Sequence, residues 1–275
     1  MRVVLRGRGD LTEWRDAARD LVRQKIAPRD IEWLTTGSVG QELFDVATPA
    51  PEIDTADVFV PKDFVTLAEC LICHRDPARF DLCYRLLWRL QIEKRLLEMP
   101  TDPDMARARA RAMHRAVHRD SHKMTAFVRF KEVHSATHRR AFVAWFEPDH
   151  YIVARTAGFF RRRFADMDWV IATPMGSAMW DGEALRVHDE PAENPGLSDE
   201  ADDLWRTYFA NIFNPARLKV KMMQTEMPKK YWRNLPEADL IPELIAGAEQ
   251  RVRDMALREA THSVPKFHER LQERR

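Results

Sequence analysis

The sequence predicts an α+β fold that is rich in helix, and three observations support this prediction. Short apolar runs on either side of an amphipathic segment predict a small N-terminal β-α-β unit. Three consecutive segments with apolar residues at helical spacing then predict a helical core. From Ala126 onward the pattern changes to short strand-like runs around one helical segment. It predicts a central antiparallel β-β-α-β-β sheet packed with helices.

The predicted organisation has three parts, divided where the composition changes. Residues 1–55 form a small α/β unit, residues 56–195 hold the helical core and the sheet, and residues 196–275 form a C-terminal helical region. The first boundary lies near Thr48–Asp57, a polar and proline-rich stretch that is typical of a long loop. One compact domain containing all three parts is the alternative.

The N-terminal unit is predicted from a strand at 3–5, a helix at about 10–24 and a strand at Ile31–Thr35. Gly7 and Gly9 lie in the turn after the first strand, in the sequence RGRGDLTEW. This turn lacks the third glycine of the dinucleotide fingerprint and the Gly-Lys-Ser/Thr of the P-loop. We therefore expect no nucleotide site there.

The next segments are predicted to be helices at about 63–74, 76–99 and 104–125. The first contains Cys70 and Cys73 in the sequence CLICH, which matches the spelling of a c-type haem attachment site. A helix is the wrong context for such a site, and no second Cys-x-x-Cys completes a zinc site. The expected role of these cysteines is that of small, reduced, buried side chains.

The sheet and the C-terminal region complete the prediction. The expected strands lie at 127–130, 142–146, 169–173, 177–180 and 185–188, with a helix from about Asp149 to Phe164. Three further helices are expected at about 198–214, 215–226 and 239–262.

The formal net charge is only +1, but the charges are segregated along the chain. Met105–Arg140 holds ten Lys or Arg and two acids, a balance of +8. Asp181–Asp203 holds nine acids and one Arg, a balance of −8. A protein with this pattern can present a basic face to an anionic polymer and an acidic loop to a protein partner.

Aromatic residues alternate with cations in Leu204–Glu237, a composition that suits a nucleic-acid surface as well as a protein core. Cations neutralise phosphates, and aromatic faces accept unstacked bases. Trp232, Tyr231 or Phe130 are candidates to stack a base. The candidate nucleic-acid-binding residues are Arg115, Arg119, Lys123, Arg129, Arg161, Arg162, Arg163, Arg217, Lys219, Lys221, Lys229, Lys230, Tyr231, Trp232 and Arg233.

Two sets of residues are candidates for chemistry. His122, Glu147 and His150 lie around the predicted hairpin and could supply an acid, a base or ligands. His114, His118 and His122 share one stripe of a predicted helix, but arginines on the adjacent stripe oppose a divalent metal. We expect no metal and no cofactor, and no triad, Walker motif or nucleophile elbow is present.

Four segments carry a resemblance to a known family: LWRTYFANIFNPARLKVKMMQTEMPKKYWRNLPEA, CHRDPARFDLCYRLLWRLQ, RDSHKMTAFVRFKEV and FVAWFEPDHYIVARTAGFFRRRFADMDWVIATP. The chain resembles, from the opening MRVVL to about Met255, a bacterial domain of unknown function described as a probable DNA metabolism protein. Members of that family stand beside a putative DNA-repair radical-SAM protein or are fused to a uracil-DNA glycosylase superfamily domain. The resemblance implies a role on DNA with a partner that does the chemistry. It carries no catalytic residue over to this chain.

Three functions follow as hypotheses. The first is a DNA-binding accessory protein in DNA repair or base modification, working with a uracil-DNA glycosylase-type or radical-SAM partner. The second is an enzyme acting on a nucleobase or a phosphodiester in DNA, and the third is a docking subunit that uses the acidic segment. The sequence has no Cys-x3-Cys-x2-Cys for a radical-SAM cluster, so a partner would have to supply that chemistry. No signal sequence or membrane-spanning run is recognised, and we expect a cytoplasmic protein.

Overall fold

A computed structural model of the protein describes residues 1–5, 9–36, 58–97, 105–133, 139–196, 223 and 225–247. The chain divides into two compact units, Met1–Pro195 and Gly196–Arg275. The fold class is α+β, as the sequence predicts. None of the described helices is long and apolar enough to cross a lipid bilayer.

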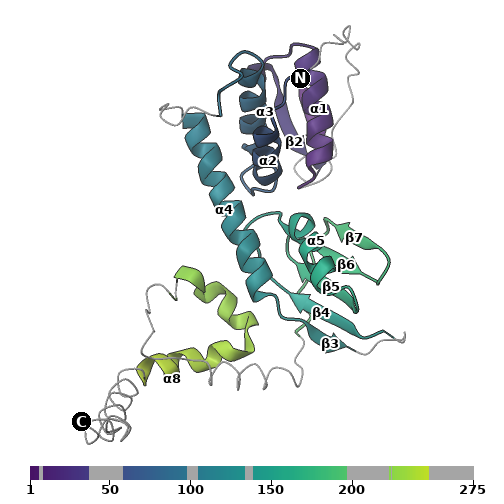
Figure 1. Ribbon diagram of the computed structural model, residues 1–275, viewed down its shortest axis with the longest axis vertical. Helices are drawn as coiled ribbons and strands as arrows, with labels where there is room; N and C mark the ends of the chain where they lie inside the picture. The colour runs from purple at the N-terminus through teal and green to yellow at the C-terminus, as the bar shows by residue number, and fades with distance from the viewer. Residues whose placement is uncertain are drawn as a thin grey trace, which may run out of the picture. The chain divides into compact units, whose positions relative to one another are not determined.

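The first unit opens with the predicted β-α-β motif (Figure 1). Strand β1 (Arg2–Leu5) pairs in parallel with β2 (Glu32–Thr35), and α1 (Leu11–Arg23) connects them. The Asp10 side chain caps α1 by accepting a hydrogen bond from the Thr12 N–H at 2.7 Å. Trp14, Ala18 and Leu21 recur at helical spacing and form the buried side of α1.

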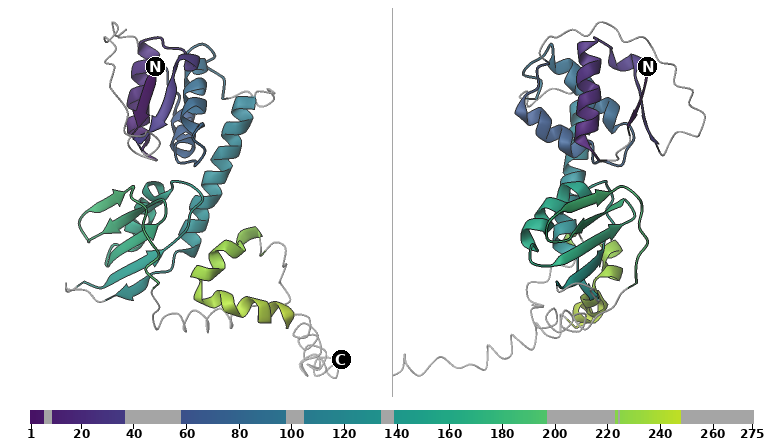
Figure 2. Two further views of the ribbon diagram at one scale, coloured as in Figure 1. Left: turned by 180° about the vertical axis from the view of Figure 1, so that it is seen from behind. Right: turned by 90° about the vertical axis from the view of Figure 1, so that its right-hand side faces the viewer.

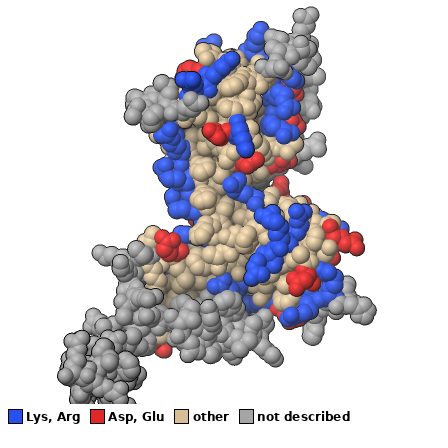
Figure 3. Space-filling model, viewed as in Figure 1, with Lys and Arg blue, Asp and Glu red and all other residues tan. Residues whose placement is uncertain are grey.

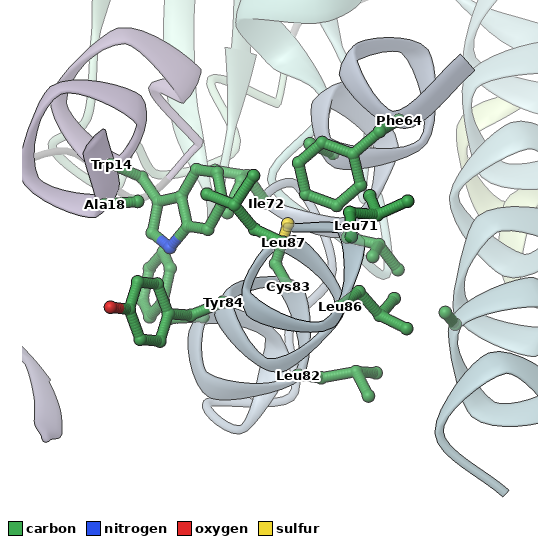
Figure 4. Packing of buried hydrophobic residues seen from close by; sticks show 14 of the residues in the cluster. Trp14, Ala18, Phe64, Leu71, Ile72, Leu82, Cys83, Tyr84, Leu86 and Leu87 are labelled. Atoms are coloured by element: carbon green, nitrogen blue, oxygen red, sulfur yellow. The ribbon is translucent and has the colours of Figure 1, made fainter. Parts of the chain in front are cut away.

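Two helices follow, α2 (Lys62–Leu71) and α3 (Arg79–Leu90), and they form a core with the β-α-β motif to which Ala110 and Met113 of the next helix also belong. Figure 4 shows side chains of α2 and α3 packed against Trp14 and Ala18 of α1. The Tyr84 hydroxyl, at the edge of this core, donates a hydrogen bond to the Ile26 carbonyl at 2.8 Å. Because the core includes side chains from both sides of the predicted boundary near residue 55, the N-terminal motif folds against α2 and α3.

Helix α4 (Met105–Phe127) is the longest described helix. It packs against α2 and α3 near its start and against α5 (Val153–Arg163) further along, as Figures 1 and 2 show. The predicted strand at 127–130 is wrong, because α4 extends to Phe127. The Arg129 guanidinium donates a hydrogen bond to the Ala126 carbonyl at the end of this helix. The next strand begins only at Lys131.

The sheet contains five strands in the order β3-β4-β5-β6-β7. Its strands are β3 (Lys131–Val133), β4 (Ala141–Trp145), β5 (Asp168–Thr173), β6 (Gly176–Trp180) and β7 (Leu185–His188). The prediction of a wholly antiparallel sheet is wrong at one pairing, because β4 and β5 are parallel. Helix α5 forms the crossover between them, and a crossover brings the second strand back in the same direction.

An aromatic cluster fixes α5 to this part of the unit. Phe160, which is 2% exposed, has ring neighbours in Phe130, Phe164 and Trp169 at centroid separations of 6.0, 6.5 and 6.2 Å. Phe130 is therefore a packed side chain here, and its ring also lies 5.1 Å from that of Phe164. Aromatic contacts of this kind hold the inner face of α5 in one orientation.

The second unit is described between residues 223 and 247, residue 224 excepted. It contains two 3₁₀ helices, Lys229–Asn234 and Pro236–Leu240, followed by α8 (Ile241–Ala246). Tyr231, Leu235 and Ile241 are buried. The helices predicted at 198–214 and 215–226, and the rest of that at 239–262, lie largely outside the described residues.

One close approach ties the β-α-β motif to the loop before α5. Gly9, just before α1, has no room for a side chain, because an added Cβ would lie 2.9 Å from the Tyr151 carbonyl oxygen. Gly158, inside α5, does have room, since its added Cβ would meet only the Arg162 guanidinium at 3.5 Å.

We predict opposite effects of alanine at these two glycines. Gly9→Ala should lower the free energy of unfolding by about 1–3 kcal/mol, because backbone must shift to relieve the overlap. Gly158→Ala should raise it by about 0.5–1 kcal/mol, since alanine is the better helix former. Chemical denaturation of both variants measures the difference, and a Gly9→Ala protein as stable as the parent would contradict the close approach.

Candidate functional site

The exposed side of α4 carries a stripe of arginines. Arg111, Arg115 and Arg119 are four residues apart, so they follow one face of the helix, and all three are exposed. His118 lies on the same side, and its ring stacks on that of His114 at 6.2 Å. Figure 3 shows the Lys and Arg side chains gathered along this helix.

Helix α5 continues the basic face. Its sequence VARTAGFFRRR holds four arginines and no acid, and all four guanidinium groups belong to exposed residues. Arg155 of α5 and Arg115 of α4 both contribute to lowering the pKa of His114, after the larger effect of burial and that of His118. The two helices therefore present their cations to the same region of space.

Within the part of the chain that the structure describes, these cations lack acidic partners. Elsewhere in that part, exposed arginines pair with carboxylates, as Arg2 does with Glu32 and Arg85 with Asp81. No such ion pair is present at the following residues, which we call the basic surface: Arg111, Arg115, Arg119, Arg155, Arg161, Arg162 and Arg163.

A polar junction positions this surface by joining α4 to the loop before α5. The Asp120 side chain, only 4% exposed, accepts hydrogen bonds from the backbone N–H groups of Asp149 and His150, both at 2.9 Å. A buried carboxylate is retained where charge-assisted hydrogen bonds compensate its lost hydration. Asp120 therefore holds residues 149–150 against α4, three residues before α5 begins.

Two histidines meet at the same junction. The His150 ring, 6% exposed, lies 4.3 Å from the ring of His74, which comes from the loop between α2 and α3. Each ring accepts a backbone hydrogen bond at Nδ1, His150 from Arg75 at 3.3 Å and His74 from Asp76 at 3.1 Å. An accepting Nδ1 carries no proton, so both rings are held as the neutral Nε2–H tautomer.

Electrostatics favour the neutral form of His74. Burial lowers its pKa first, and the positive charges of Arg75, Arg79 and Arg109 act in the same direction against the opposing effect of Asp76. Burial is the largest single effect on Asp76 and would raise its pKa. The hydrogen bonds from Arg109, at 2.6 Å, and from the Ala78 N–H, together with the charges of Arg109 and His74, leave that pKa lowered.

The cysteines beside this junction are inert. Burial raises the pKa of Cys73 to about 12 and that of Cys70 above its ordinary value, so neither is a thiolate at neutral pH. Cys83 is also buried, and all three are free thiols. Among the described residues, no three His, Cys, Asp or Glu side chains group as metal ligands would.

Two of the three residues predicted to be catalytic, His122 and His150, lie apart. His150 is buried in the junction, where its backbone and its Nδ1 both have structural partners. His122 is exposed on α4, and because it lies two residues from Asp120 it points about 200° away from the junction side. Glu147 is half-buried before the junction loop. His122 and His150 thus lie on opposite sides of α4.

The predicted nucleic-acid contacts fall into several groups. Arg115, Arg119 and Arg161–Arg163 belong to the basic surface, while Lys123 and Arg129 are half-buried beside it. Arg217, Lys219 and Lys221 lie outside the described residues.

In the second unit, Lys229, Lys230 and Arg233 are exposed. Tyr231 is 1% exposed, so its ring is buried and neither of its faces is accessible to a base. Trp232 is half-buried, with its indole N–H donated to the Met227 carbonyl at 2.9 Å.

The acidic segment begins as a turn. Asp181 accepts backbone hydrogen bonds from Ala184 and Glu183, and with an ion pair to Arg186 these lower its pKa to about 2. This carboxylate organises the turn between β6 and β7. Residues 197–203 of the segment lie outside the described residues.

Sequence reasoning placed Arg111 on one exposed stripe with Arg115 and Arg119 from their helical spacing. It missed Arg155 as a surface cation and Asp120 as the residue that holds the junction. No local signal could have identified Asp120, since its partners are 29 and 30 residues away.

Comparison with known proteins places this site in a family. The model of the domain of unknown function DUF4130 matches residues 77–237, more than half of the chain. The chain belongs to the DUF4130 family. Within the match lie α3, α4, the five-stranded sheet with α5, and the 3₁₀ helix at Lys229–Asn234. The basic surface and Asp120 are inside the DUF4130 region, whereas the β-α-β motif and His74 precede it. No curated protein and no solved structure matched the chain.

We predict that Asp120→Ala lowers the free energy of unfolding by about 2–4 kcal/mol. The substitution leaves two buried N–H groups without their acceptor, and each such group costs about 1–3 kcal/mol. The control is Asp166→Ala at an exposed position, where the change should stay within about 0.5 kcal/mol. Equal stability of the two variants in chemical denaturation would show that the junction does not depend on this carboxylate.

A second prediction concerns pH. Because the pKa of His74 is lowered from 6.5 in the folded protein, the unfolded chain binds more protons just below that value. The contribution of the neutral His74 to the free energy of unfolding is fully present above pH 6.5, and it is lost as the pH falls through the lowered pKa of His74. His74→Asn keeps a side-chain acceptor but does not titrate. Its free energy of unfolding should therefore decline less between about pH 7.5 and about pH 5.5.

The matched control for His74 is His188→Asn on β7, which is exposed and outside the junction. It should retain the pH dependence of the parent protein. A His74→Asn protein that follows the parent curve at every pH would contradict the assignment.

Proposed function

We propose that this protein is a DNA-binding accessory factor in DNA repair or base modification. The observation that carries the proposal is the basic surface of α4 and α5, seven exposed arginines without an acidic partner among the described residues. Like charges placed side by side repel each other, which destabilises a fold unless a ligand uses them. A phosphate backbone is a ligand that neutralises several such charges at once and releases its counterions.

The geometry suits a polymer better than a small anion. The arginines of α4 recur every four residues, about 6 Å apart along the helix axis, and those of α5 extend the surface sideways. All of these arginines are exposed. An extended open row of cations favours a ligand with repeated charges.

The exposed Lys229, Lys230 and Arg233 offer a second set of cations in the C-terminal unit. They are proposed as additional phosphate contacts, and reversing their charges alone tests them. Because the resemblance carries no catalytic residue over to this chain, we assign the chemistry to a partner. The resemblance stated above suggests that this partner is of the uracil-DNA glycosylase or radical-SAM type.

The test is a triple charge reversal on the basic surface, Arg115→Glu, Arg119→Glu and Arg162→Glu. DNA affinity should fall, and the slope of log affinity against log salt should become shallower by up to about 0.9 for each duplex phosphate that the variant no longer neutralises. Fluorescence anisotropy with a labelled duplex and a labelled single strand across a salt series measures both quantities.

The matched control reverses three exposed arginines elsewhere, Arg2, Arg29 and Arg85, and changes the net charge by the same amount. Its affinity and its salt slope should remain close to those of the parent. If the two triple variants lose affinity equally, binding depends on net charge alone and the proposed surface is wrong.

A further inference from the structure

One exposed aromatic side chain lies within the basic surface. Phe159 of α5 is 40% exposed although it is a large apolar residue. Arg155 precedes it by four residues, and Arg162 and Arg163 follow it by three and four. Residues three and four apart are neighbours on a helix, so these three arginines extend from positions next to this phenylalanine.

The core does not require Phe159. The adjacent Phe160 fills the inner side of α5 and makes the contacts with the aromatic cluster described above. Phe159 meets only the edge of this cluster, with its ring 5.3 Å from that of Phe160 and at 85° to it. This contact and the packed helix hold the exposed ring on a rigid support, which favours a preformed binding surface.

Gly158 lies on the helix beside two of the same arginines. It lies three residues after Arg155 and four before Arg162, on their side of α5. A glycine inside a helix is unfavourable relative to alanine, and here a methyl group would meet no backbone. The missing side chain lets the Arg162 guanidinium lie close to the helix, with one nitrogen 3.5 Å from the place a Cβ would take.

We propose that Phe159 stacks on an unpaired base, so that the protein binds single-stranded DNA more tightly than a regular duplex. In a duplex the base faces are already covered by their neighbours, whereas a single strand offers a free face to an aromatic ring beside each phosphate. An aromatic ring among cations is the combination used to bind single strands without sequence preference. This inference rests on the proposed DNA-binding function and names the strand state that the basic surface recognises.

The test compares Phe159→Ala and Phe159→Trp with the parent protein, using a single-stranded oligonucleotide of mixed sequence and its duplex. Phe159→Ala should bind the single strand about 5- to 150-fold more weakly, which is the effect of losing one stacked base. Its salt slope should be unchanged because every cation that meets a phosphate is still present. Duplex affinity should remain that of the parent, and Phe159→Trp should retain tight single-strand binding.

Phe59→Ala is the matched control, because Phe59 is 38% exposed but lies in the segment before α2, away from α5 in the sequence. It should bind both oligonucleotides as the parent does. Circular dichroism and thermal unfolding of each variant establish that the fold is intact, as expected for substitutions at exposed positions.

The possible failures are distinguishable. Salt-dependent binding by the parent, with single-strand affinity unchanged in Phe159→Ala, overturns the stacking inference and leaves the proposed function standing. Equal losses on single strand and duplex overturn it as well, since stacking on an unpaired base affects only the former. If the parent protein binds neither oligonucleotide at low salt, the proposed function itself fails.

Discussion

The hydrogen bonds from Asp149 and His150 to the buried Asp120 carboxylate are the interaction on which the candidate site depends. They connect the middle of α4 to the loop that leads into α5, and His150 in turn contacts His74 of the N-terminal core. Three segments far apart in the sequence meet here. Together with the direct packing of α4 against α5, this junction fixes the arginines of the two helices relative to each other.

The junction and the basic surface differ in whether their charged side chains have partners. At the junction, the buried carboxylate has backbone donors, and the nearby Asp76 is paired with Arg109, so the charges are compensated. On the basic surface the cations accumulate without an acidic partner among the described residues. Two of them, Arg155 and Arg115, add to the lowering of the pKa of His114, after burial and the effect of His118. Buried charges with hydrogen-bond partners stabilise a fold, whereas exposed cations without acidic partners are available to a ligand. This division is expected where different residues provide stability and ligand binding.

Much of the fold could be predicted from local pattern. Short apolar runs around residues 11–23 indicated the β-α-β motif, and the period change near residue 126 indicated the sheet with its one covering helix. The direction of β4 relative to β5 was missed, because strand pairing is a long-range property that alternation of side chains does not encode. The strand expected at 127–130 was wrong because apolar residues at a helix end resemble a strand over four positions.

Part of the candidate site could be predicted from the sequence, and there is a physical reason why the rest could not. Surface cations are recognisable by composition and spacing, so Arg115, Arg119 and Arg161–Arg163 could be selected from the sequence. His150 looked equally suited to chemistry, but its surroundings are set by contacts with residues 74, 75 and 120, which no local spacing reveals. Phe159 was overlooked because exposure separates it from Phe160, and adjacent phenylalanines look alike in a sequence.

The most direct measurement is arginine-selective chemical footprinting of the protein with and without a single-stranded oligonucleotide, read out by peptide mass spectrometry. If α4 and α5 form the DNA-binding surface, the oligonucleotide should protect Arg115, Arg119, Arg155 and Arg162 from modification. The equally exposed Arg2, Arg29 and Arg85 should react as they do in the free protein. Protection of the second group, or equal protection of both, would contradict the assignment of this surface to DNA.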